Sequence, residues 1–186
     1  MVSTNTIQHT GSATKTRMQV LTALFAAVCA ICSQLIIPIQ PVPISLGSFA
    51  ALMAGGFLGR RHGALAVALF VILGAAGAPV FSMMRGGLAI VAGPGGGFII
   101  GYILMAWVVG YVGEKFGFTF KSLVPGCVLG TACCYALGNA WFMFLTGNNL
   151  AATMALCVFP FIPGDIAKCI LASVICSRYR KKLIEI

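Results

Sequence analysis

The sequence predicts an all-α integral membrane protein, a bundle of six transmembrane helices, and three observations carry this prediction. Hydrophobic residues make up 60% of the 186 residues and charged residues only 8%, whereas soluble domains contain about 25% charged residues. Apolar runs that approach the thickness of a bilayer recur along the chain. The basic residues cluster between these runs on one predicted side, as they do in cytoplasmic loops.

Pro, Gly and polar residues separate the spans, because they interrupt helices. The spans cover approximately residues 18–38, 46–58, 64–81, 88–112, 123–145 and 150–176. Three prolines within 38–43 predict an irregular Pro-rich loop between the first two helices. The Gly-rich run 93–97 predicts a break at the start of the fourth helix. We expect a disordered cytoplasmic tail at 1–16, the six-helix transmembrane domain at 17–182 and a second cytoplasmic tail at 183–186.

The net charge of +9 fits this topology. Six spans place both tails and two loops on the same side of the membrane. That side holds ten of the 12 Lys and Arg residues: Lys15, Arg17, Arg60, Arg61, Lys115, Lys121, Arg178, Arg180, Lys181 and Lys182. An excess of this kind marks the cytoplasmic side, so both termini are predicted to be cytoplasmic. We assign the positive charge to topology and to contact with anionic lipid headgroups, and expect no nucleic-acid partner.

An acid and a base, Asp165 and Lys168, lie three residues apart inside the last span. On a helix this spacing places both on one face, and charges at membrane depth mark sites or mutual pairs. The two could neutralise each other as a structural ion pair, or hold a ligand between them. The adjacent Pro163-Gly164 favours a site, because a broken helix frees backbone groups that must line a cavity or be satisfied by protein.

Two further polar residues are expected near this pair. Asn139 has a donor and an acceptor, which suit an amide or ureido-like group or an interhelical hydrogen bond. Arg85 lies on the outer side, where it could bind an anionic group or remain an exposed loop charge. The helical rise gives Asn139 and the pair a similar depth, so we predict a pocket that opens outward.

Other chemistries find less support. Cys29 and Cys32 form a C-x-x-C pair, but inside an apolar span, so an intramembrane thiol oxidoreductase remains only an alternative. No metal site is expected at His62, no catalytic triad is visible, and the Gly-rich run lacks the Lys of a nucleotide-binding loop. We therefore expect no enzyme and no cofactor. Small residues at Ala23/Ala27 and Ala26/Ala30 favour close helix packing, inside the bundle or against a partner.

Several segments together resemble the BioY family, the biotin-binding S components of energy-coupling factor transporters. The resemblance covers nearly the whole chain from about Arg17. Its segments are Pro41-Val42-Pro43-Ile44-Ser45-Leu46, Gly77-Ala78-Pro79-Val80-Phe81, Arg85-Gly86-Gly87, Gly93-Pro94-Gly95-Gly96-Gly97-Phe98 and Phe161-Ile162-Pro163-Gly164-Asp165-Ile166-Ala167-Lys168.

The resemblance implies that the 17–182 domain captures biotin from outside and delivers it inward, in a bacterial inner membrane. It implies a membrane scaffold subunit and two cytoplasmic ATPases as partners; a solitary secondary vitamin transporter is the alternative. The implied biotin contacts are Asp165, Lys168, Asn139, Arg85, Ser45 and Gly96. The implied docking surface for the scaffold is the small face formed by Ala23, Ala26, Ala27 and Ala30.

Overall fold

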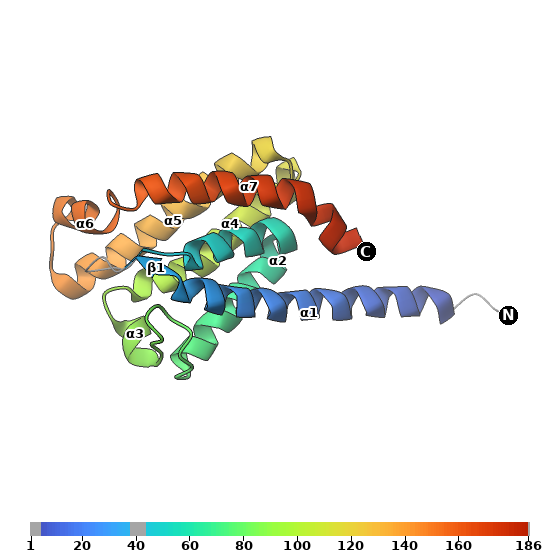
Figure 1. Ribbon diagram of the computed structural model, residues 1–186, viewed down its shortest axis with the longest axis horizontal. Helices are drawn as coiled ribbons and strands as arrows, with labels where there is room; N and C mark the ends of the chain where they lie inside the picture. The colour runs from blue at the N-terminus through green and yellow to red at the C-terminus, as the bar shows by residue number, and fades with distance from the viewer. Residues whose placement is uncertain (1–4, 38–43, 186) are drawn as a thin grey trace.

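The structure is a computed structural model that describes residues 5–37 and 44–185 (Figure 1). Within these ranges, helices form almost all of the regular structure, so the prediction of an all-α fold is confirmed. The helices are α1 (Asn5–Gln34), α2 (Gly47–Ala75), α3 (Leu88–Ala92), α4 (Gly96–Phe116), α5 (Phe120–Thr146), α6 (Leu150–Cys157) and α7 (Ile162–Glu185). A two-residue antiparallel ladder, β1 (Ile36–Ile37) with β2 (Ile44–Ser45), is the exception.

The first helix, α1, begins at Asn5, ahead of the expected boundary at residue 17. Residues 5–16, which we had expected to belong to a disordered tail, are part of this helix. A helix that is already nucleated gains one backbone hydrogen bond with each added residue, so polar residues can continue an apolar helix beyond its membrane span. The Pro-rich loop expected at 38–43 lies outside the described residues.

The helix α2 contains a sharp reversal at Gly59, whose φ of 79° and ψ of −176° are not helical. A Cβ placed on Gly63 would lie 2.7 Å from the carbonyl oxygen of Ala54, whereas nine residues of straight helix span about 13 Å. The two arms of α2, residues 47–58 and 60–75, therefore fold back against each other. We had expected residues 59–63 to separate two helices, but one glycine performs the reversal because it tolerates positive φ.

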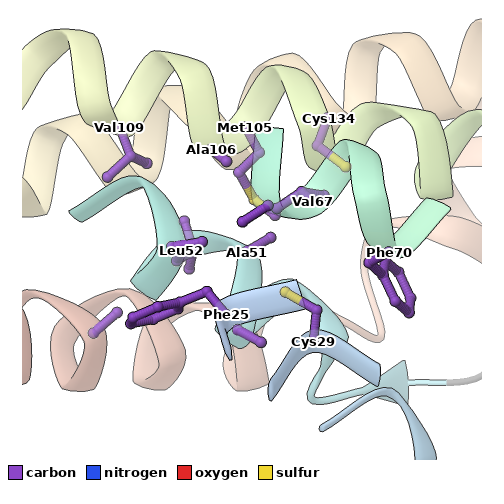
Figure 2. Packing of buried hydrophobic residues seen from close by; sticks show 14 of the residues in the cluster. Phe25, Cys29, Ala51, Leu52, Val67, Phe70, Met105, Ala106, Val109 and Cys134 are labelled. Carbon is purple, nitrogen blue, oxygen red and sulfur yellow. The ribbon is translucent and has the colours of Figure 1, made fainter. Parts of the chain in front are cut away.

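The core lies between α1, the two arms of α2, α4, α5 and α7. In Figure 2, Leu52 from the first arm lies between Phe25 of α1 and Met105 of α4. Close approach of the backbones depends on small residues, as is usual for helices packed in membranes. At Gly55, a Cβ would overlap the backbone of Ala106 in α4.

Four described helices are long and apolar enough to cross a membrane: α1 from Lys15, α2, α4 and α5. The pair α6 and α7, bent by 58°, would be a fifth span if the two are counted together. Large apolar side chains also point outward, and Phe144, for example, is 84% exposed. The chain is therefore a multi-pass membrane protein whose apolar surface suits lipid.

Figure 1 shows that the start of α1 and the end of α7 lie at the same end of the molecule. A hydrogen bond of 2.5 Å from Arg17 Nη2 to the carbonyl oxygen of Leu183 joins these two helices. At the opposite end lie α3, α6 and the strand pair. We call this opposite end the α3–α6 end.

Candidate functional site

The acid and base of the last span form an ion pair in the first two turns of α7. Asp165 lies in the first turn of the helix, where the helix dipole favours a negative charge. Pro163 is tolerated in the same turn because the N–H that it lacks would have no partner within the helix. The distance from Lys168 Nζ to Asp165 Oδ1 is 3.0 Å, and the two side chains are 11% and 13% exposed. The structure therefore shows the mutual pair; contact of either residue with a ligand stays a prediction.

Lys168 also ties α7 to the beginning of α2. Its ammonium donates to the backbone carbonyl of Ser45 at 2.9 Å and to the hydroxyl of Ser48 at 3.0 Å. An ammonium has three N–H donors, so Asp165, Ser45 and Ser48 together account for all of them. A ligand that binds Lys168 directly must replace one of these acceptors.

The second carboxylate oxygen of Asp165 accepts a hydrogen bond from the phenol of Tyr135 in α5. We did not predict Tyr135 or Ser48 as site residues. A signal for Tyr135 was present, since it lies four residues before Asn139, and residues at this spacing share one helix face. The ion pair is thus embedded in a network that joins α2, α5 and α7.

Two adjoining cavities meet at the side of this network. The larger, of about 340 Å³, has the size of a small-molecule pocket, and the smaller, of about 40 Å³, contains the ion pair. Both are lined by Ser45, Phe98 and Tyr102. The other residues lining the larger cavity are Ser33, Phe70, Phe81, Ser82, Arg85, Ala89, Ile90, Gly93, Pro94, Gly95, Ile99, Phe142 and Thr146.

Arg85 supplies the charged group of the larger cavity. It closes a turn in which the backbones of Phe81 and Arg85 pair. Its guanidinium donates to the carbonyl oxygen of Ser82 at 3.4 Å and to the sulfur of Met83 at 3.5 Å, both neutral acceptors. The ion pairs found in the described part of the chain are Lys168–Asp165 and Arg60–Glu114. The positive charge of Arg85 is therefore not matched by a carboxylate there.

Two other predicted contacts lie outside the lining of both cavities. Asn139 is buried at 7% exposure in α5, and its Oδ1 has no hydrogen-bond partner among the described residues. Gly96 is buried where α4 begins, and a Cβ there would overlap the carbonyl of Val91. Gly96 thus permits the close turn between α3 and α4, while Gly93, Pro94 and Gly95 face the cavity instead.

Trp141 of α5 fixes this Gly-rich wall. Its indole Nε1 donates to the carbonyl oxygen of Gly93 at 3.0 Å. A Cβ on Gly97 would overlap the Trp141 side chain, so the glycine allows the indole to lie close to the start of α4. The wall of the larger cavity is therefore held from α5.

The four small residues of α1 divide between two faces. Ala26 belongs to the core and Ala30 packs partly against it, whereas Ala23 and Ala27 are exposed. The physical reason is the arc of about 100° between successive residues of a helix. Ala26 therefore does not form part of an accessible docking surface, and Ala23 with Ala27 remain as the predicted one.

The residues that we considered for redox chemistry or metal binding lie in environments that fit a role in packing. Cys29 is 1% exposed, and all eight Cys are free thiols. His62 lies 3.3 Å from the hydroxyl of Thr22. Within residues 5–37 and 44–185, no group of three or more His, Cys, Asp or Glu residues could hold a metal ion.

Comparison with known proteins finds similar sequences that cover most of the chain. The BioY family profile matches residues 4–185. The biotin transporter BioY of Thermotoga maritima is 33% identical over 169 residues, which cover 91% of this chain and 99% of the relative. The biotin transporter BioY of Rhizobium etli is 39% identical over 172 residues, or 86% of this chain and 91% of the relative.

A solved structure is similar as well. The S-component for biotin from an ECF-type ABC transporter aligns with a TM-score of 0.84 at 31% identity. The alignment covers 97% of this chain and 95% of that one.

Proposed function

The chain belongs to the BioY family, and from this premise we propose that it is a membrane subunit that captures biotin from the outer side and delivers it inward. The observation that carries the proposal is the cavity of about 340 Å³ with Arg85 at its lining and the Asp165–Lys168 pair in the adjoining chamber. Biotin combines an apolar bicycle and chain with two polar ends, a ureido group and a carboxylate.

The two polar ends of biotin match two different parts of this site. We assign the carboxylate to Arg85, because guanidinium groups bind carboxylates well and no carboxylate of the described chain pairs with this one. We assign the ureido group to the wall that the chambers share, at Ser45 and Tyr102, next to the ion pair. The aromatic rings of Phe70 and Phe98 then cover the apolar middle of the ligand.

Transport inward requires a source of energy, and we propose an energising module formed by a membrane scaffold subunit and two cytoplasmic ATPases. The solved structure that the chain resembles is the S-component of an ECF-type ABC transporter, which supports this partnership. We propose that the exposed Ala23 and Ala27 on α1 form the docking surface, because small residues let two helices approach closely.

For the topology we propose six crossings of the bacterial inner membrane, with each arm of α2 counted as one and the bent pair α6–α7 as the last. Both termini are then cytoplasmic, and the α3–α6 end faces outward. The clustering of Lys and Arg on one predicted side and the common end of α1 and α7 support this orientation.

Binding of biotin to the purified chain in detergent tests the proposal. We expect a Kd below about 1 μM, which corresponds to a binding free energy of roughly −8 kcal/mol. A Kd for biotin above this value contradicts the proposed function. Uptake of biotin by cells that make the chain with and without the scaffold and ATPases separates an energised subunit from a solitary secondary transporter.

The alternative of an intramembrane thiol oxidoreductase needs thiols that a redox partner can reach. Cys29 is 1% exposed inside the bundle, and this burial does not favour the alternative. Loss of biotin uptake in a Cys29→Ser/Cys32→Ser double variant that still binds biotin would revive it.

A further inference from the structure

The turn that presents Arg85 has a strained backbone. The N–H of Phe81 donates to the carbonyl of Arg85 at 2.9 Å, and the N–H of Arg85 donates back at 3.3 Å. Between them, Met83 and Met84 have φ values of 65° and 55°, in a left-handed region that is unfavourable for residues with a side chain. Two successive residues of this kind persist only where surrounding structure holds them.

Gln34, the last residue of α1, supplies that support. Its Nε2 donates to the carbonyls of Phe81 at 3.1 Å and Pro79 at 3.3 Å. Its Oε1 accepts from the backbone N–H of Met84 at 3.0 Å. A primary amide is suited to this task because it presents donors and an acceptor on one planar group.

The three hydrogen bonds hold the backbone of the turn from which Arg85 projects. One side of the turn is anchored by Phe81, which is 2% exposed and packs edge-on against Phe70 at a centroid distance of 5.5 Å. The other side has Met84, whose N–H is held by Gln34, immediately before Arg85. Gln34 is not among the residues that line the two cavities, so it acts on a ligand through the turn.

We propose that Gln34 is a positioning residue that fixes the Phe81–Arg85 turn, and thereby sets the affinity of the larger cavity for the carboxylate of its ligand. This inference rests on the proposed binding of biotin. It assigns a function in ligand selection to a side chain at the end of α1, at a distance of 51 residues in sequence from Arg85.

The test compares biotin with biotin methyl ester, which lacks the negative charge, on wild type and on Gln34→Met. Methionine keeps an unbranched chain of similar length and removes all three hydrogen bonds. We expect the Kd for biotin to rise about tenfold, a typical effect for loss of hydrogen bonds that orient a charged contact, and the Kd for the ester to change less than about twofold. Gln19→Met makes the same substitution at an exposed position of α1 and should leave both values unchanged.

A second arm asks whether the effect passes through Arg85. In an Arg85→Met background, Gln34→Met should change the Kd for biotin by less than about twofold, because no guanidinium remains to be positioned. If Gln34→Met does not fold, Gln34→Glu is measured with the same two ligands. Glu keeps the acceptor, loses both donors and adds a charge close to Arg85, so the preference for biotin over the ester should again collapse.

The outcomes separate this inference from the proposed function. Wild type that binds neither ligand overturns both. Wild type that binds biotin, together with a Gln34→Met variant that weakens biotin and ester equally, overturns the role of Gln34 while the proposed function stands. An effect that persists undiminished in the Arg85→Met background does the same.

Discussion

Removing the ammonium of Lys168 isolates a buried carboxylate. In Lys168→Met, Oδ1 of Asp165 loses its partner at 3.0 Å, while the side chain of Asp165 remains only 13% exposed. Methionine retains most of the apolar length of lysine, so the substitution tests charge more than packing. The carbonyl of Ser45 and the hydroxyl of Ser48 lose a donor at the same time.

The expected loss of stability follows from these contacts. Breaking a buried pair by removing one partner costs about 3–5 kcal/mol. The hydrogen bond from Tyr135 continues to stabilise the other oxygen of Asp165, so we take the lower limit, about 3 kcal/mol. For a chain of this length each kcal/mol lowers Tm by about 2–4 °C, which predicts a decrease of about 6–12 °C.

Thermal unfolding in detergent micelles, without ligand, measures this decrease. The double variant Asp165→Asn/Lys168→Met should recover a large part of it, because no charge is then left uncompensated, and Asn can still accept from Tyr135. Lys121→Met removes a lysine that is exposed at the start of α5 and serves as the matched control. A Lys168→Met variant that melts within about 2 °C of wild type would refute the reasoning, as would a double variant less stable than the single one.

Three further substitutions test the scaffold of the site by thermal unfolding and biotin binding. Gly59→Ala should destabilise the fold by about 2 kcal/mol or more, because φ is 79° in a region that only glycine adopts readily. Its control is Gly164→Ala, which should be nearly neutral because nothing lies within 4 Å of the added Cβ. Trp141→Phe removes the hydrogen bond to Gly93, and should cost about 1 kcal/mol and weaken biotin binding. Phe81→Ala should cost about 3–5 kcal/mol, because a ring that is 2% exposed leaves a void beside the cavity. Unchanged melting of any of the three would contradict the packing described here.

The contact between Asp165 and Lys168 could be predicted because charges are rare in this chain. Only 3 acidic residues occur in the whole chain, so an Asp three residues before a Lys in an apolar run is conspicuous, and the helical repeat implies that they meet. The proposed outer position of Arg85 is inferred from the distribution of the other basic residues. These inferences need only composition and local helical geometry.

The contacts made by neutral polar side chains could not be predicted in the same way. Gln34 and Tyr135 act through partners 50 and 30 residues away, and nothing in local sequence specifies which helices will adjoin. Gly59 was placed in an interhelical segment, but the sharpness of its reversal depends on packing between the arms of α2. Asn139 was singled out for its polarity, and its side chain is buried in α5 outside both cavities.

The hydrogen bond from Lys168 to Ser45 joins positions that are 123 residues apart. This contact affects how fast the two segments can separate. The strand that carries Ser45 cannot swing away from α7 unless the ammonium first finds another acceptor. A displacement of that strand away from α7 therefore requires the exchange of a charged hydrogen bond. For a ligand whose entry requires that displacement, the observed association rate should level off at high ligand concentration.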